Sequence, residues 1–596
     1  MRHSTRRRRL LALAVGLAAP LIGLAVVQPA AQASGTPGGG NEIRPYRPGA
    51  DDNGPDIPAP KSNAPSRVPA SHVPTPRDLP VTGASGVTEQ WSGLTMKDQR
   101  TANGGNSFSL EPPDQGLCVG NGYVIEAVNN VFSISTTSGA LVSGPLSMAP
   151  FWNNGTPEID RSNPQSPVYG PFVSDPKCYY DPATGRFFMT ELQLGTNPTT
   201  GDFDGTSFEN IAVSKSSTPS TDSSDWYLYQ LDVANDGTNG TPNHQGCPCL
   251  GDQPLIGADK YGFYLTTNEF PIFAPGFNGA QIYAFDKAAL ESGTMTVQRI
   301  ETDAPGLPLA EGTAYSVQPA TSPTAGEWDT ANNGTEYFMS ALEFTGKLDN
   351  RIAVWALTNT ASLASGSPDV TLSHAVVGSE VYGFPPDATQ MKGAVPLADA
   401  VNAKENLIAS NDDRMNQVVY ADGKLWGGLN SVVKNRNGNT NAGIAYFVAA
   451  PSIDATGTVS ATMANQGYVA VNRNNVIFPA IGVNPDGSAV LVFSLTGRNY
   501  FPSAAMVHLD STGALTSGVQ VLAEGQAADD GFSGYTAYGG AGVGRWGDYS
   551  AAVSDGSGNV WVATEYIPGT FGWSGYSSGN NGFLANWGTY VAQVTP

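Results

Sequence analysis

A repeated pair of strand-like segments is the feature that most constrains the fold of this chain. Each repeat starts at a turn with Gly or Asp and continues into a short strand, usually with an aromatic residue. These segments are 123–126, 186–189, 262–265, 336–339, 424–426, 489–492 and 559–562. A strand of alternating apolar residues follows each one, at 130–135, 210–215, 281–286, 351–357, 443–448, 504–510 and 589–594. The spacing of about 60 to 95 residues is typical of a repeat architecture.

Seven repeats, each with room for four short strands, predict an all-β fold and a seven-bladed β-propeller. The 70 glycines and 44 prolines fit a fold with many turns. The last repeat has three strands before the chain ends at Pro596, and the strand-like stretch 86–92 precedes the first repeat. We expect this N-terminal strand to pair into the last blade and close the ring. A pair of β-sandwiches or a β-helix is the alternative architecture.

The N-terminal region has the features of an export signal. Arginines precede an apolar run at 10–27, and Ala31-Gln32-Ala33 resembles a cleavage site, so residues 1–33 are interpreted as a signal peptide. A twin-arginine leader and a Sec leader both fit. Residues 34–85 are rich in Pro and Gly and predict a disordered linker. Residues 86–596 then form the propeller domain of a secreted, extracellular protein.

Charge and composition exclude several classes of partner. The formal net charge is −22, and removal of the arginine-rich leader makes the exported chain more acidic. Nucleic acid and anionic lipid are therefore excluded as partners. With 23 Tyr, 23 Phe and 10 Trp, the chain can form a packed core. After the leader, no apolar run is long enough to span a membrane. We also expect the protein to be a monomer.

Four cysteines in an exported chain favour disulfides. Cys118 and Cys178 occupy equivalent places in the first strands of adjacent repeats, which predicts a Cys118–Cys178 bridge. The remaining pair, Cys247 and Cys249, would then form a bridge across one residue, because a bent chain brings alternate Cα atoms into range. The alternative is a metal site at Cys247-Pro248-Cys249, with His244 as a third ligand.

Carboxylates recur at the open ends of the predicted hairpins. Each first strand starts near an Asp and each second strand ends near a Glu. The pairs are Asp175 with Glu191, Asp252 with Glu269, and Asp548 with Glu565, and Asp114 and Asp413 extend the inner set. Because the first strands of all blades run the same way along the axis, these acids should converge on one rim. Paired carboxylates around a cleft are what glycoside hydrolysis needs.

Two other interpretations of these acids stay open. In the structural one, each Asp caps the turn into a blade and each Glu holds a neighbouring backbone amide. In the other, the clustered oxygens bind Ca²⁺, the one cofactor that the sequence suggests.

Cations and aromatic residues interrupt the repeat near the same rim. Arg414 follows Asp413, and Arg545-Trp546 precedes Asp548. These arginines would either grip a carboxylated sugar or neutralise the acids. Trp546 and Trp573 would add surface on which a sugar ring can stack. We therefore expect Arg414, Arg545, Trp546 and Trp573 to bind substrate.

Three segments resemble the broad superfamily of secreted sialidase-like and Asp-box propeller proteins. They are 175–187, 251–259 and 545–550, the last reading Arg545-Trp546-Gly547-Asp548-Tyr549-Ser550. The resemblance spans roughly residues 105–596 and implies a propeller fold. Sialidase chemistry uses three arginines, and only two stand near this rim, so the resemblance implies the fold and not that activity.

Together these features predict a propeller that binds an extracellular polysaccharide or glycan at an acidic axial cleft and hydrolyses it. The expected acid and nucleophile or base are among Asp252, Glu269, Asp548 and Glu565. The alternative function is a non-enzymatic adhesion or scaffold module of the cell envelope.

Overall fold

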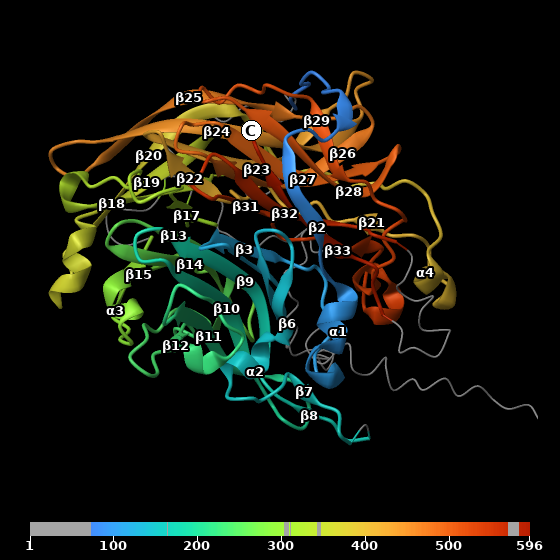
Figure 1. The fold of residues 1–596 in the computed structure, drawn as a ribbon, viewed down its shortest axis with the longest axis horizontal. Helices are drawn as coiled ribbons and strands as arrows, with labels where there is room; N and C mark the ends of the chain where they lie inside the picture. The colour runs from blue at the N-terminus through green and yellow to red at the C-terminus, as the bar shows by residue number, and fades with distance from the viewer. Residues whose placement is uncertain (1–72, 164, 303–308, 310–311, 343–346, 570–582) are drawn as a thin grey trace, which may run out of the picture.

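The computed structural model describes residues 73–163, 165–302, 309, 312–342, 347–569 and 583–596. The expected signal peptide and most of the expected linker fall in 1–72, outside the described residues. Antiparallel strands in sets of four dominate the described chain (Figure 1), so the all-β prediction is confirmed.

The strand sets follow one another along the chain. Each set consists of strands that are consecutive in sequence, except that the last set adds an N-terminal strand to three strands from the C-terminal end. The first three sets are β3 (Gln115–Gly120), β4 (Tyr123–Val128), β5 (Val131–Thr136) and β6 (Leu141–Ser147); β9 (Phe172–Asp181), β10 (Arg186–Thr196), β11 (Phe203–Ser214) and β12 (Trp226–Asp232); and β13 (Cys249–Ala258), β14 (Gly262–Pro271), β15 (Gly279–Asp286) and β16 (Val297–Glu301). The next two are β17 (Gln318–Thr321), β18 (Thr335–Ala341), β19 (Asp349–Thr358) and β20 (Thr371–Tyr382); and β22 (Val418–Ala421), β23 (Lys424–Lys434), β24 (Thr440–Ile453) and β25 (Val459–Val469). Parallel pairing of β17 with β22 joins these two sets into one eight-stranded sheet. The last two are β26 (Asn474–Val483), β27 (Ala489–Gly497), β28 (Tyr500–Leu509) and β29 (Val519–Ala523); and β31 (Ala551–Ser554), β32 (Val560–Tyr566), β33 (Gly588–Val594) and β2 (Val87–Thr95).

The first strands of these sets form a closed ring. Contacts run from β3 to β9, β13, β17, β22, β26 and β31 in turn, and β31 contacts β3 again. Each set of strands therefore packs between two neighbours, which buries its inner strands on both faces, whereas outer strands such as β6 and β25 are partly exposed. β13 and β26 are buried along their whole length for this reason. Aromatic rings fill the interfaces, as where Phe188 stacks on Phe263 with ring centroids 5.0 Å apart.

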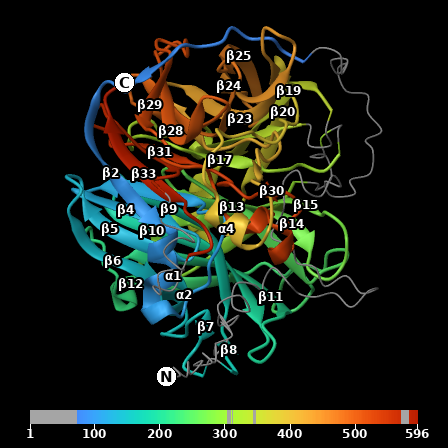
Figure 2. The ribbon, with the colours of Figure 1, turned by 90° about the vertical axis from the view of Figure 1, so that its right-hand side faces the viewer.

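The N-terminal strand joins the C-terminal one, as the sequence predicts. β2 pairs antiparallel with β33, from Val87 opposite Val594 to Thr95 opposite Gly588, and the two lie side by side in Figures 1 and 2. A second strand, β1 (Val81–Gly83), pairs in parallel with β29. The linker prediction to residue 85 is therefore wrong at its end, because the backbone of 81–83 completes the edge of a sheet.

Short elements fill the connections. The helices are α1 (Met96–Gly105), α2 (Met148–Trp152), α3 (Lys287–Glu291) and α4 (Pro396–Ala400), and two-stranded ribbons join β7 (Ile159–Asp160) to β8 (Val168–Tyr169) and β21 (Leu407–Ile408) to β30 (Val543–Gly544). Turns of 3-10 helix occur at Ser223–Asp225, Ala331–Asn333, Thr360–Ser365, Phe532–Gly534 and Thr536–Tyr538. Within the described ranges, no helix has the length and apolar character needed to cross a membrane.

Candidate active site

An acidic pocket lies where several first strands begin. We call it the axial acid pocket. Apolar side chains such as Leu192, Phe203 and Leu250 form part of its wall, and its charged lining residues are Glu111, Asp114, Asp175, Asp252, Asp548 and Arg545. Asp114 and Asp548 precede β3 and β31, whereas Asp175 and Asp252 lie within β9 and β13. The volume of the pocket is about 580 Å³, which includes open solvent at its mouth. The structure thus brings together Asp252, Asp548 and Arg545 of the residues predicted from the sequence.

The backbone turns the acids inward through an unusual conformation. Asp114 and Asp175 have φ angles of 43° and 60°, and Gln253, next to Asp252, has 50°. Side chains other than Gly rarely adopt this left-handed region, so each position is strained. At Asp175, the side chain of Asn129 stabilises the strained backbone. Its Oδ1 accepts hydrogen bonds from the Asp175 amide at 3.1 Å and from Ser174 Oγ at 3.0 Å.

The two predicted aspartates have different surroundings. Asp548 Oδ2 accepts a hydrogen bond from Arg545 Nη2 at 2.5 Å, and the Asp548 amide donates to Asp114 Oδ1 at 2.8 Å. The Arg545 guanidinium therefore opposes the rise that burial imposes on the pKa of Asp548. Burial and, next, the neighbouring Asp175 raise the pKa of Asp252 to about 7. Asp252 can therefore keep its proton near neutral pH, and burial also raises the pKa of Glu111 and Asp114 in the same pocket well above their usual values.

Arg414 does not line the axial acid pocket. It is 2% exposed and forms a bidentate pair with Asp412, at 2.7 Å from Nε and 2.8 Å from Nη2. Its Nη1 donates to Gln253 Oε1, and Gln253 follows Asp252. The charge of Arg414 is thus already paired inside the protein, which does not fit the expectation that Arg414 grips substrate.

Glu269 points away from Asp252. In the β13–β14 hairpin Asp252 lies opposite Asn268, and Glu269 lies opposite Gly251. Successive side chains on a strand point to opposite faces, so Glu269 and Asn268 diverge. Glu269 instead accepts hydrogen bonds from His244 Nδ1 at 2.7 Å and Asn278 Nδ2 at 2.9 Å.

Glu565 has the structural role that the sequence left open. Its Oε2 accepts a hydrogen bond from the Gly547 amide at 2.7 Å, and Glu336 holds the Ala320 amide at 3.0 Å in the same way. Glu126 extends the pattern to the closing strand, where it accepts from the Leu94 amide. In each case a buried Glu on the second strand of a set accepts a hydrogen bond from a backbone amide.

The aromatic predictions have mixed outcomes. Trp546 is 1% exposed, and its Nε1 donates to Ser494 Oγ at 3.0 Å. It is a core residue, and the prediction that it stacks on substrate is wrong. Trp573 lies outside the described residues.

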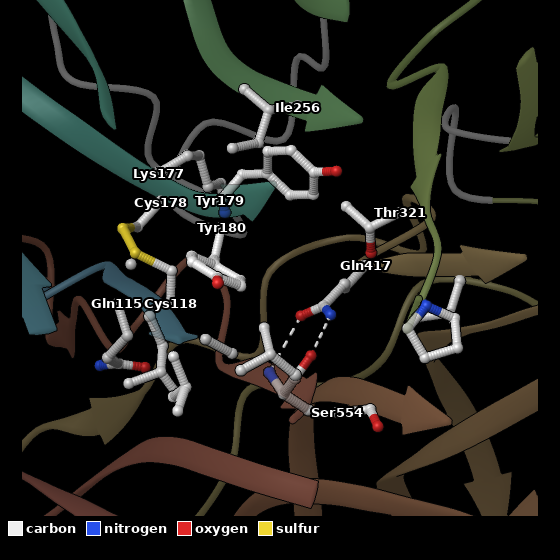
Figure 3. A pocket seen from close by; sticks show the side chains of 18 of the residues that line it. Gln115, Cys118, Lys177, Cys178, Tyr179, Tyr180, Ile256, Thr321, Gln417 and Ser554 are labelled. Carbon is white, nitrogen blue, oxygen red and sulfur yellow. Dashed lines mark hydrogen bonds between the residues drawn. A yellow bond between two sulfur atoms is a disulfide. The ribbon is translucent and has the colours of Figure 1, made fainter. Parts of the chain in front are cut away.

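A second cavity follows the axial acid pocket along the same strands. Gln115, Lys177 and Tyr549 line it, and each lies within two residues of an acid of the first pocket. The Lys177 ammonium lies over the Tyr549 ring, and burial lowers the pKa of Lys177 to about 7. Figure 3 shows Lys177 and the Cys118–Cys178 disulfide at the wall of this cavity. Sequence reasoning missed Lys177 and Tyr549, whose only signal is their position one or two residues after an axial Asp.

The cysteines are paired as the sequence favours. Cys118 bonds to Cys178 across β3 and β9, and Cys247 bonds to Cys249 at the start of β13. Both sulfurs of Cys247-Pro248-Cys249 are therefore engaged with each other, which removes the metal site with His244 in this oxidised form.

We expect the folded protein to be more stable near pH 5 than near pH 7. Burial raises the pKa of Asp252, Glu126 and Asp529 to about 7 and that of Glu158 to about 8. Unfolded carboxyl groups titrate near pH 4, so between about pH 4.5 and 7 the folded chain binds more protons and loses stability as pH rises. The lowered pKa of Lys177 acts only above about pH 7. Thermal unfolding at constant ionic strength tests this, and a midpoint that rises from pH 5 to 7 would contradict it.

Comparison with known proteins finds similar solved structures at low sequence identity. No family model matches the chain, and no curated protein matches it. Among solved structures, an exo-beta-1,3-galactanase from Clostridium thermocellum has 10% identity over 80% of this chain and 92% of its own, with a TM-score of 0.28. The Hadza microbial sialidase Hz136 has 9% identity over 79% and 73%, with a TM-score of 0.34. A protein of unknown function from Dyadobacter fermentans has 11% identity over 70% and 93%, with a TM-score of 0.33. Likeness at this level does not bear on the activity of the chain.

Proposed function

We propose that this chain is an exported seven-bladed β-propeller that hydrolyses an extracellular glycan in the axial acid pocket. One observation carries the proposal: Asp252 and Asp548 line the same pocket, and only Asp548 is paired with a guanidinium. Glycoside hydrolysis uses two carboxyl groups whose surroundings hold them in different protonation states.

The roles of the residues follow from these surroundings. Asp252, with a pKa of about 7, is the general acid that protonates the leaving oxygen. Asp548, beside Arg545, is the carboxylate that acts as nucleophile or base. Arg414 donates a hydrogen bond to Gln253, the residue that follows Asp252, and so positions the backbone that carries Asp252. Glu269 and Glu565 are left out of the reaction, because neither lines the pocket.

The charge of the pocket indicates the substrate class. Among the described residues, five acids and one arginine line it, and that arginine is already paired with Asp548. No other cation of the described chain lines the pocket to hold the carboxylate of a uronate or a sialate. We therefore propose a neutral or amino-sugar glycan in place of the carboxylated sugar that the sequence suggested.

The architecture supports this site. The seven four-stranded sets would be the blades, with the acids at the rim where first strands begin. Two disulfides suit an oxidising compartment, in line with the export expected from residues 1–33. We propose a secreted monomer. The rival function is an adhesion or scaffold module, which would bind a glycan without turnover.

A polysaccharide panel tests the proposal. It includes chitosan, chitin, a neutral galactan and a polyuronate, each with and without a chelator. We expect sugar release from a neutral or amino-sugar member and none from the polyuronate. Binding to a member without release would establish the rival function. If the chelator abolishes sugar release and added Ca²⁺ restores it, the result would show that Ca²⁺ is part of the site.

A further inference from the structure

The Cys247–Cys249 disulfide has an uneven environment. Cys249 is fully buried and is the first residue of β13, opposite Pro271 of β14. Cys247 is half-buried and follows the exposed residues Gln245 and Gly246. One sulfur of the bridge therefore belongs to a residue near solvent, and the other belongs to a residue inside the protein. By contrast, both Cys118 and Cys178 are buried, at 1% and 8% exposure.

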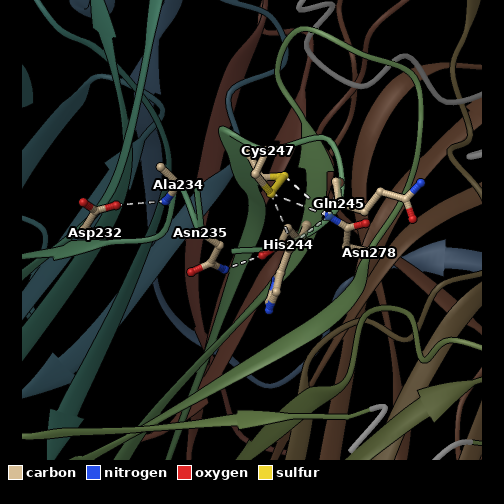
Figure 4. Close-up of a disulfide and its surroundings, with 9 residues drawn as sticks. Asp232, Ala234, Asn235, His244, Gln245, Cys247 and Asn278 are labelled. Atoms are coloured by element: carbon tan, nitrogen blue, oxygen red, sulfur yellow. Dashed lines mark hydrogen bonds and ion pairs between the residues drawn. A yellow bond between two sulfur atoms is a disulfide. The ribbon is translucent and has the colours of Figure 1, made fainter. Parts of the chain in front are cut away.

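Side chains that can accept a proton or donate a hydrogen bond to a thiolate lie around this bridge, among them His244 and Asn278 (Figure 4). Glu269 Oε1 lies 3.6 Å from Cys247 Sγ. The Asn278 side-chain amide lies 3.6 Å from Cys247 Sγ and 3.5 Å from Cys249 Sγ, where it can donate to either thiolate. These contacts place an acid and a hydrogen-bond donor at the two sulfurs.

His244 connects Glu269 to solvent. Its Nδ1 lies 2.7 Å from Glu269 Oε1, and its Nε2 lies 3.3 Å from Glu301 Oε1. The Glu269 side chain is 1% exposed, whereas those of His244 and Glu301 are 17% and 46% exposed. The hydrogen bond to Glu269 is the main cause that raises the pKa of His244 to about 9. A buried carboxylate beside a sulfur thus has a charged, solvent-reaching partner through which protons can pass.

An apolar surface adjoins the half-buried cysteine. Phe273 is 38% exposed, and the carbon position that a side chain at Gly205 would take lies 3.1 Å from both Phe273 and Pro248. Phe273 and Pro248 therefore both lie close to Gly205, and Pro248 is the residue between the two cysteines. An exposed aromatic ring near Pro248 suits a peptide segment with apolar residues next to its cysteines.

We propose that Cys247 and Cys249 form a thiol–disulfide exchange centre for peptide dithiols, separate from the glycan site. A substrate thiolate attacks Cys247 Sγ, the bond between Cys247 and Cys249 breaks, and its electron pair passes to Cys249 Sγ, which takes a proton. The second substrate thiolate attacks the substrate sulfur of the mixed disulfide, and Cys247 Sγ leaves and takes a proton. Two electrons and two protons move from the dithiol to the protein. The same steps in reverse, with a second peptide disulfide as oxidant, restore the bridge.

Each neighbouring residue has a defined part in this exchange. Glu269 takes the proton of the incoming thiol and returns it to the leaving sulfur, with His244 linking it to solvent. Asn278 stabilises the thiolate that leaves. This role accounts for a buried Glu that the glycan site does not use.

The first experiment uses the intact protein and a synthetic peptide with two thiols flanked by apolar residues, under anaerobic conditions. We expect one peptide disulfide per protein molecule. Alkylation and mass spectrometry should then find free thiols at Cys247 and Cys249, with Cys118 and Cys178 still bridged. Peptide oxidation no faster than without protein, or equal reduction of both bridges, would overturn the proposal.

Variants then assign the steps. Cys249→Ser should trap the oxidised peptide as a mixed disulfide on Cys247, whereas Cys247→Ser should not trap it. The double variant Cys118→Ala, Cys178→Ala is the matched control and should keep the exchange. Glu269→Gln should slow exchange on the order of 100-fold and change its pH profile. A folded Cys249→Ser protein that traps no peptide, or an unchanged rate and pH profile in Glu269→Gln, would contradict the mechanism.

Discussion

Asp252→Asn should lower the rate of glycan hydrolysis on the order of 1000-fold, because Asn keeps the shape of Asp but cannot protonate the leaving oxygen. In the unchanged protein, activity should fall as pH rises through about 7, where Asp252 loses its proton. The residual activity of the variant should lack this limb. Initial rates of sugar release from pH 5 to 9 measure both effects.

Two companion variants make this test specific. Asp548→Asn should cause a loss of similar size, because it removes the carboxylate that Arg545 holds. Asp454→Asn changes an exposed turn between β24 and β25, where Asp454 accepts hydrogen bonds from Thr456 and Thr458, and should keep full activity. The fold of Asp252→Asn should survive, since Asp252 and Asp175 repel each other. A folded Asp252→Asn protein with full activity would refute the assignment of the acid.

Removal of the closing strand should cause the largest loss of stability. A chain that starts at residue 96 lacks β1 and β2, which leaves β33 and β29 as open sheet edges. It also uncovers Trp561, whose ring centroid lies 5.7 Å from that of Trp91. In β2 Leu94 is buried and Val87 and Trp91 are partly buried. Burial of one such side chain is worth up to about 3 kcal/mol, so their loss removes much of the stability of an ordinary domain. We expect the chain to unfold at least 10 °C lower or to fail to fold, at about 1 kcal/mol per few degrees.

A chain that starts at residue 73 is the matched control, because it keeps every residue of β1 and β2. Adding a synthetic peptide of residues 73–95 to the shortened chain should restore stability by pairing with β33. Equal unfolding midpoints for the chains starting at 73 and 96 would show that the ring does not depend on this closure.

The chain's local patterns determined its strands and the rim that carries its acids. Turns with Gly or Asp, followed by alternating apolar residues, predicted the strands from β4 to β33, since hairpins depend on contacts between near neighbours. The recurrence of Asp at the start of first strands predicted the meeting of Asp252 and Asp548, because equivalent ends of a ring of strands lie on one rim. The Cys118–Cys178 bridge followed from the same equivalence, and Cys247 and Cys249 were the remaining pair.

Only the tertiary structure decided which partner each side chain meets. Glu269 is one residue from Asn268, and that single step turns it from the axis toward His244 and the Cys247–Cys249 bridge. Arg414 is paired by Asp412 two residues before it, yet its contact with Gln253 depends on a strand, β13, far away in sequence. Trp546 is buried in a cluster with Phe478 and Trp587, and its indole donates a hydrogen bond to Ser494 of β27. Periodicity specifies which residues form strands, but burial, charge pairing and the choice of face depend on neighbouring sheets, which strand patterns alone do not encode.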